Sequence, residues 1–172
     1  MAENISNEQL RERCLTKLLS SSKDQDLLKE YNFHGNVEDD TSMYFSIHHL
    51  IAQLWISKKN VSTFLHAVRS FPDEESAKNF HKDEKTIESL LEIKSFEKKI
   101  GTEYHKSTFV TIGTDPFGVV ASMPDPLLGV IKMYILLFRE GSFVHKIMVP
   151  RANKSANVIQ LIKSIAEKIL AI

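Results

Sequence analysis

The amino-acid sequence predicts a single-domain α+β protein, in which a mostly antiparallel sheet of about six strands is covered by an N-terminal, a middle and a C-terminal helix. Such an arrangement is an α/β/α sandwich. Apolar residues at helical spacing occur near both ends of the chain. Between them, runs of aromatic and β-branched residues are separated by short turn sequences, which is typical of hairpins. The length of 172 residues suits one domain with a hydrophobic core.

Charged residues are unevenly distributed along the chain. Of the 34 residues from Asp73 to Lys106, 16 are charged, against 6 of the 43 from Ser107 to Val149. The first stretch predicts solvated helix with connections, and the second predicts a buried sheet. Lys and Arg together number 22, as do Asp and Glu. This balance argues against nucleic acid or an anionic membrane as a partner, since both select a basic excess.

Residues 1–42 are expected to form an N-terminal helix and a loop. Ser6 is a good N-cap, with Gln9 at capping-box spacing. A short helical turn is expected around Asp26 to Tyr31, and Gly35 with the acidic residues 38–40 indicates a loop. The apolar stripe of the helix, which ends at the serines 20–22, consists of Leu10, Cys14, Leu15, Leu18 and Leu19.

Residues 43–172 are expected to form the sandwich, and the first part of it is a hairpin. Tyr44 to Ile56 and Val61 to Phe71 are its strands, with Trp55 and Phe64 near the tip. Lys58-Lys59-Asn60 separates the strands, and a loop of two or of three residues leaves the register open. After Pro72, Asp73 or a neighbour caps a helix with Ala77 and Phe80 on its inner face, and a further helix is expected over residues 87–96.

The C-terminal half is expected to be mostly sheet. Residues 104–112 and 119–123 are predicted strands, with a turn over residues 115–118 between them. Residues 130–138 and 143–149 form a hairpin around Glu140-Gly141. With that loop, the opposite pairs are Phe138 with Phe143, Tyr134 with Ile147, and Met133 with Met148. Both faces of this hairpin are apolar, so it is either a central pair covered by layers on both faces or has one face that binds a partner.

The last helix has the clearest pattern. Ser155 is its predicted cap, and the apolar residues that follow at helical spacing are Val158, Ile162, Ile165, Ile169 and Ile172. This stripe is suited to covering a sheet.

The order of these elements resembles a known family. The segments that carry the resemblance are Leu50 to Ser57 returning through Val61 to Phe64, Pro72 to Phe80, Tyr134 to Val144 and Leu161 to Ile169. They look like PsbP-like α/β/α sandwich domains and similar small extracytoplasmic lipoprotein domains of bacteria and archaea. The resemblance covers roughly residues 44–170. It implies a non-enzymatic binding or assembly role and transfers no catalytic residue.

The sequence contains no recognised catalytic, cofactor or metal-binding motif. There is one cysteine, Cys14, whose place on the apolar stripe favours a core residue over a nucleophile. Adjacent His48 and His49 on a strand point to opposite faces and cannot chelate one ion together, although His66 could approach one of them across the hairpin. We therefore expect no enzyme activity, no cofactor and no bound metal.

The leading functional hypothesis is a non-enzymatic binding or protein-interaction module that acts through an apolar surface or a sheet face, with a protein partner or self-association. The alternative is a carrier of a small apolar ligand in a pocket between sheet and helices. The candidate ligand or partner residues are Trp55, Phe64, Tyr104, Phe109, Tyr134, Phe138 and Phe143. A third hypothesis is an enzyme that uses His48, His49 or His66 with a carboxylate within hydrogen-bonding reach in one cleft.

The location of the protein is left open by the sequence. The polar amino terminus has no hydrophobic signal-peptide core, and no apolar run is long enough to cross a membrane. As written, the chain is expected to be soluble and cytoplasmic. It would be extracytoplasmic if an export signal had been removed ahead of Met1.

Overall fold

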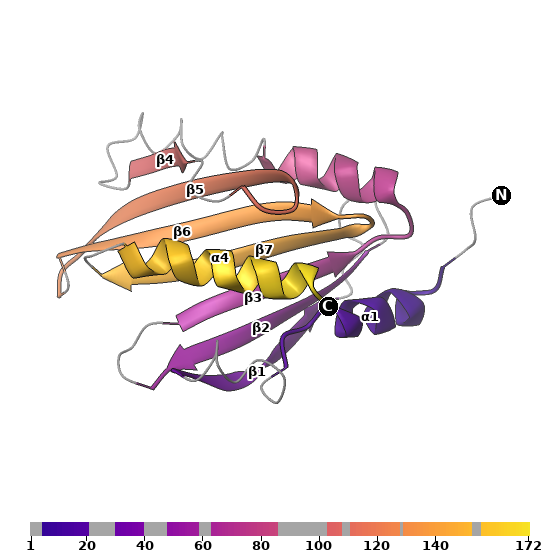
Figure 1. The fold of residues 1–172 in the computed structure, drawn as a ribbon, viewed down its shortest axis with the longest axis horizontal. Helices are drawn as coiled ribbons and strands as arrows, with labels where there is room; N and C mark the ends of the chain where they lie inside the picture. Colours follow the sequence, from indigo (N-terminus) through magenta and orange to yellow (C-terminus); the bar gives the residue numbers. More distant parts are fainter. Residues whose placement is uncertain are drawn as a thin grey trace.

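The computed structural model describes residues 5–20, 30–39, 48–58, 63–85, 103–107, 111–127, 129–152 and 156–172. Its centre is an antiparallel sheet of seven strands in the order β1-β2-β3-β7-β6-β5-β4 (Figure 1). The strands are β1 (Tyr31–Asp39), β2 (His49–Ser57), β3 (Thr63–Ser70), β4 (Glu103–Ser107), β5 (Thr114–Asp125), β6 (Gly129–Glu140) and β7 (Phe143–Ala152).

Helices cover both faces of this sheet. Helices α1 (Asn7–Thr16) and α4 (Ala156–Leu170) lie on one face, where α4 runs across the middle strands (Figure 1). Residues 74–85 form a helix on the other face, where Ala77 packs with Phe71 and with apolar residues of β5, β6 and β7. The predicted class, a single α+β domain with three helices around an antiparallel sheet, is confirmed.

The sheet contains one strand more than the approximately six predicted, because residues 31–39 form β1. The interpretation of residues 35–40 as a loop, and of residues up to Tyr31 as a helical turn, is therefore wrong where the structure describes them. Strand β1 pairs with β2, and a bulge between Phe33 and Gly35 shifts the register. The register places no residue of β2 opposite His34, and the next residue, Gly35, has a φ of +150°, which suits a residue without a side chain.

The first predicted hairpin is present as β2 and β3. Trp55 and Phe64 lie near its tip, as expected, and the structure places them directly opposite each other, with Ile56 and Thr63 as the last pair. The connection is thus longer than either of the two loops weighed from the sequence.

The second hairpin, β6 and β7, is also present, but its register differs by two residues from the prediction. Glu140 pairs with Phe143, so Gly141 and Ser142 form the loop and Phe138 lies opposite His145. Tyr134 accordingly faces Val149, and Met133 faces Pro150. Gly141 has φ +54° and so supplies the left-handed conformation at the first loop position. A shift of two residues keeps every side chain on its predicted face.

This hairpin lies in the middle of the sheet and is covered on both faces. Leu136 and Ile147 are fully buried in the cluster with α4. Leu137 and Val144 are buried in the cluster with the helix over residues 74–85. The two-sided apolar pattern of the hairpin is therefore that of a central pair of strands.

The predicted turn over residues 115–118 is instead a bulge inside β5. The register with β6 shifts between Thr114 and Phe117, and Asp115 has φ +58°. The chain kinks there without reversing, because pairing with β6 resumes at Phe117.

The helix ends follow their capping residues. Ser6 and Gln9 form the predicted capping box of α1, and Asp73 Oδ1 accepts a 2.7 Å hydrogen bond from Ser76 N at the start of the middle helix. Helix α1 ends at Thr16, earlier than predicted. The predicted stripe of α4 is buried from Val158 to Ile169, whereas Ile172 lies beyond the helix and is exposed. The predictions on Ser155 and on residues 87–96 lie outside the described residues. Within the described parts of the chain, no helix is long and apolar enough to cross a membrane.

Candidate functional site

Strand β1 forms one edge of the sheet and carries two exposed apolar side chains. Its pairing partner is β2, and its other side pairs with no strand among the described residues. Phe33 is 46% exposed and Val37 is 66% exposed. An edge strand with exposed apolar side chains offers backbone N–H and C=O groups together with apolar contact area to another chain.

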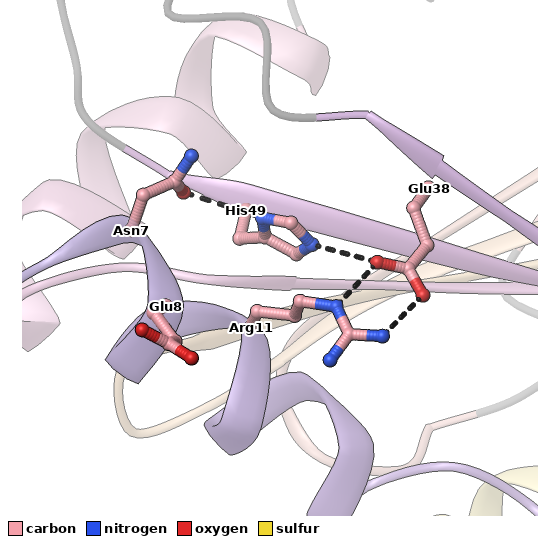
Figure 2. A pocket seen from close by; sticks show the side chains of 5 residues that line it. All are labelled: Asn7, Glu8, Arg11, Glu38 and His49. Carbon is pink, nitrogen blue, oxygen red and sulfur yellow. Dashed lines mark hydrogen bonds and ion pairs between the residues drawn. The ribbon is translucent and has the colours of Figure 1, made fainter.

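A polar pocket opens beside the far end of this strand, with a volume of about 510 Å³. Its walls come from three elements, namely the first turns of α1, the end of β1 and the start of β2 (Figure 2). The lining residues are Asn7, Glu8, Arg11, Glu38 and His49.

One ion pair joins α1 to β1 across this pocket. Arg11 Nε donates to Glu38 Oε2 at 2.6 Å and Nη2 donates to Glu38 Oε1 at 2.9 Å, which is the bidentate geometry of guanidinium and carboxylate (Figure 2). The hydrogen bond from Arg11 lowers the pKa of Glu38, and the same carboxylate raises the pKa of Arg11. Glu38 is thus ionised at neutral pH, and both of its carboxylate oxygens are bound by Arg11.

His49 completes the network beneath the ion pair. Its side chain is buried, with Nε2 3.5 Å from Glu38 Oε2 and Nδ1 3.2 Å from Asn7 Oδ1 (Figure 2). This brings a predicted histidine and a carboxylate together in one pocket, as the third hypothesis requires. Both ring nitrogens, however, face acceptor atoms of the protein, so neither is directed at the open space where a substrate would lie. The arrangement ties α1 to β1 and β2.

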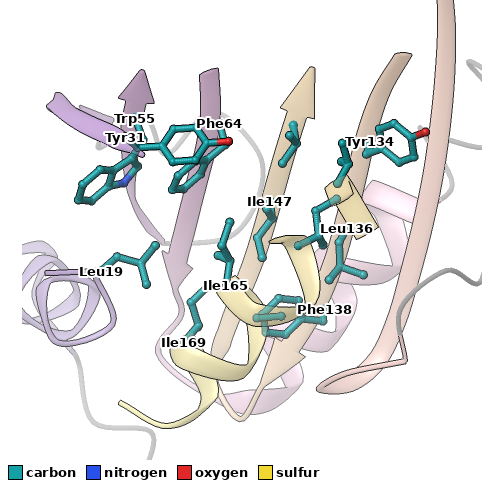
Figure 3. Close-up of a cluster of buried hydrophobic side chains, with 14 residues drawn as sticks. Leu19, Tyr31, Trp55, Phe64, Tyr134, Leu136, Phe138, Ile147, Ile165 and Ile169 are labelled. Carbon is teal, nitrogen blue, oxygen red and sulfur yellow. The ribbon is translucent and has the colours of Figure 1, made fainter. Parts of the chain in front are cut away.

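The predicted aromatic residues lie mainly in the core. Trp55 and Phe64 stack with ring centroids 5.8 Å apart and an interplanar angle of 8°. Tyr134 and Phe138 belong to the same buried cluster, packed against α4 (Figure 3). All four side chains are buried on the α4 face of the sheet.

The other three predicted residues are divided among different places. Phe143 is partly buried beside the cluster that α1 covers, and the guanidinium carbon of Arg13 lies 5.3 Å from the centroid of its ring. Tyr104 lies in β4, but its side chain is outside those that the structure describes. Phe109 lies outside the described residues.

The adjacent residues His48 and His49 point to opposite faces of the sheet, as the alternation of side chains along a strand requires. His48 packs on Phe71 and Phe80 under the middle helix, whereas His49 faces α1. His66 approaches neither of them and meets His145 of β7 instead. In the described part of the chain, no group of three or more His, Cys, Asp or Glu side chains could hold a metal ion.

The sequence-based interpretation missed β1 and with it the pocket. Tyr31, Phe33 and Val37 recur at even spacing, separated by polar residues, which is a strand signal. Gly35 and the acidic residues at 38–40 indicated a loop and outweighed that signal. The pairing of Arg11 with Glu38 had no sequence signal, because 27 positions separate the two residues.

Comparisons with known proteins identify the fold but no family. No protein-family model matches the chain, and no curated protein matches it. Three solved chains match, among them the extracellular domain of PknH from Mycobacterium tuberculosis, with a TM-score of 0.61 and 10% sequence identity over 100% of both chains. At this identity the likeness shows that the chain shares the fold of that extracellular domain.

Proposed function

We propose that this protein is a non-enzymatic interaction module that binds an extended segment of a partner polypeptide along β1. The observation that carries the proposal is the exposure of Phe33 and Val37 on an edge strand of the sheet. In such binding, the added strand gains main-chain hydrogen bonds, and alternate side chains supply specificity.

A polar pocket borders the same strand, because Glu38 near the end of β1 is one of its lining residues. Glu8 is exposed there, on the first turn of α1, and lines the pocket beside the Arg11–Glu38 pair. A carboxylate so placed can accept hydrogen bonds from a basic or hydroxyl side chain of the bound segment.

The bulge in β1 and its acidic end limit which chains can pair there. A bulge twists an edge strand, and charged residues disfavour indiscriminate edge-to-edge association. Glu38 and Asp39 place two acidic residues at the end of β1. These features favour a partner with a matching register.

Site-specific photo-crosslinking in the source cells tests the proposal. A photoreactive phenylalanine at position 37 is expected to form a discrete crosslinked species, identified by mass spectrometry as a partner or as a second copy. The matched control carries the same group at Leu127, which is 93% exposed in the turn between β5 and β6. Equal crosslinking from both positions, or none from position 37, would rule out β1 as the binding surface.

A second measurement separates strand addition from simple proximity. Asn36→Pro removes a main-chain donor from the exposed part of β1, and Pro is poorly tolerated inside a paired strand. It is expected to lower the yield of the position-37 crosslink, while Leu127→Lys leaves it unchanged. Circular dichroism and the fluorescence of Trp55 confirm that each variant is folded. A folded Asn36→Pro variant with full crosslinking would contradict strand addition.

A further inference from the structure

Four titratable side chains form a chain of contacts that runs from the surface into the core, away from the pocket. Lys17 Nζ donates to Glu140 Oε1 at 2.9 Å, and Glu140 Oε2 lies 3.6 Å from His145 Nε2. His145 Nδ1 in turn lies 3.3 Å from His66 Nε2. Both histidines are fully buried, whereas the Glu140 side chain is 30% exposed.

The two imidazoles are arranged for the neutral state. Their rings stack with centroids 5.6 Å apart and an interplanar angle of 13°. The ring of Phe138 also stacks on that of His145, with centroids 4.9 Å apart. Burial lowers the pKa of His66 well below its usual range, and the His145 ring adds to this effect. Burial also lowers the pKa of His145, against the opposing effect of Glu140. A doubly protonated pair would place two like charges 3.3 Å apart in the core.

The groups around the pair offer one carboxylate to balance that charge. Glu140 of β6 already binds Lys17, and both His145 and Lys17 lower its pKa. Arg13 of α1 donates to Phe71 O and to Ser142 Oγ, and Cys14 donates to His49 O and Val68 O. The buried residues that α4 contributes are apolar, namely Val158, Ile162, Ile165, Ala166 and Ile169.

The segment at the C-terminal end of α1 is the part best placed to open. Gln53, the neighbour of His66 across β2 and β3, accepts from Leu19 N and donates to Leu19 O, each at 2.9 Å. Lys17 lies beside this contact and is bound to Glu140. These polar contacts, together with the buried side chains of Cys14 and Leu19, hold the segment after α1 next to the histidine pair, whereas buried aliphatic side chains alone hold α4.

We propose that the His66–His145 pair is a proton-binding site that releases α1 and the segment up to Leu19 from the sheet in acid, while α4 stays packed. Because the closed form holds the pair neutral, each proton that only the open form binds raises the open population about tenfold per pH unit below a pKa of about 6.5. Two such protons give up to about a hundredfold per unit. The sign is that of lowered histidine pKa values: the closed form is favoured above this range and lost as the pH falls.

Cys14 and Trp55 make the proposal measurable on the unmodified chain. Cys14 is the only cysteine, lies on α1 and is fully buried, whereas Trp55 is the only tryptophan and is buried in the cluster with α4. The rate of labelling of Cys14 by 4,4′-dithiodipyridine, divided by that of a small thiol at the same pH, reports the opening of α1. Trp55 fluorescence reports the rest of the core.

In the wild-type protein we expect the protection of Cys14 to fall at least about tenfold between pH 6 and pH 5. The Trp55 spectrum is expected to shift far less than on full unfolding, because only Leu19 leaves its cluster. In His66→Phe one of the two proton sites is absent, so the fall in Cys14 protection is expected to be up to about tenfold smaller than in the wild type. His145→Gln is expected to act in the same direction if His66→Phe does not fold. His34→Gln, at an exposed position of β1, is expected to leave the profile unchanged.

His49 has to be separated from this effect, because it also lies between α1 and the sheet. Its Nε2 lies 3.5 Å from Glu38 Oε2 and its Nδ1 lies 3.2 Å from Asn7 Oδ1, in a network separate from the His66–His145 pair. His49→Gln is therefore expected to keep the acid-induced loss of protection. The proposal is overturned if Trp55 reaches its fully unfolded spectrum at the pH at which Cys14 loses protection, or if His66→Phe and the wild type have the same profile.

Discussion

Gly113 is a residue at which backbone conformation and side-chain packing act together. It has φ +80°, and a Cβ added there would lie 2.5 Å from Cδ2 of Phe138. Gly129 has φ +81° with no atom within 4 Å of an added Cβ. The two glycines thus share a backbone conformation and differ in their surroundings.

These glycines give a matched pair of substitutions. Gly129→Ala is expected to lower the free energy of unfolding by about 1–2 kcal/mol, the cost of a left-handed conformation with a side chain. Gly113→Ala is expected to cost about 1–3 kcal/mol more, because Phe138 would have to move in a packed core. Urea denaturation followed by Trp55 fluorescence measures both. Equal losses in the free energy of unfolding for the two variants would show that the Phe138 ring moves aside without cost.

Gln53 is a buried polar residue whose contribution to stability depends on its hydrogen-bond partners. Its amide satisfies both the N–H and the C=O of Leu19, and it is 3% exposed. Gln53→Leu would leave two backbone groups without these partners and is expected to lower the free energy of unfolding by about 2–4 kcal/mol. Urea denaturation checks this value. A change below the error of the method would mean that Leu19 finds other partners.

At the scale of elements, α4 is held by a stripe of aliphatic side chains. Ile165 is fully buried, whereas Ile172 lies beyond the end of the helix and is 51% exposed. Ile165→Ala is expected to lower the free energy of unfolding by about 2–5 kcal/mol through lost burial and a new cavity. Ile172→Ala, the same chemical change, is expected to stay within about 0.5 kcal/mol. Thermal or urea unfolding distinguishes the two, and similar losses would contradict the packing of α4 described here.

Elements with a strong period were predictable from the sequence, and those specified by distant contacts were not. The stripe from Val158 to Ile169 and the pair Trp55 and Phe64 follow from local pattern and turn residues. Strand β1 was missed because glycine and acidic residues weaken a strand signal, and pairing with β2 overrides that local preference. The register of β6 and β7 was displaced because Gly141 was taken as the second loop residue when it is the first.

The candidate site was less predictable than the fold for the same reason. The aromatic residues singled out from the sequence are good core formers, and most of those that the structure describes lie in the core. The pocket residues come from α1, β1 and β2, so their proximity depends on the tertiary arrangement. Polar residues of this kind carry no periodic signal.

For the whole molecule, buried neutral histidines predict lower stability in acid. Burial lowers the pKa values of His66 and His145, and lowers that of His81 to about 4. The unfolded chain therefore binds more protons than the folded one below a pH of about 6.5, and stability is lost as the pH falls from there. Each histidine that stays neutral contributes about 1.4 kcal/mol per pH unit. Urea midpoints at pH 7 and pH 5 test this, and equal stability at both would contradict it.

Strand β1 at an open edge of the sheet is the central claim, because the proposed binding depends on it. Amide hydrogen exchange resolved by residue tests it most directly. In an antiparallel edge strand every second amide faces its one neighbour and the others face outward. We predict slow and fast amides alternating over residues 31–39, interrupted at the bulge, against uniformly slow exchange in β6. Uniformly fast exchange over residues 31–39 would contradict the strand, and uniformly slow exchange would contradict the open edge.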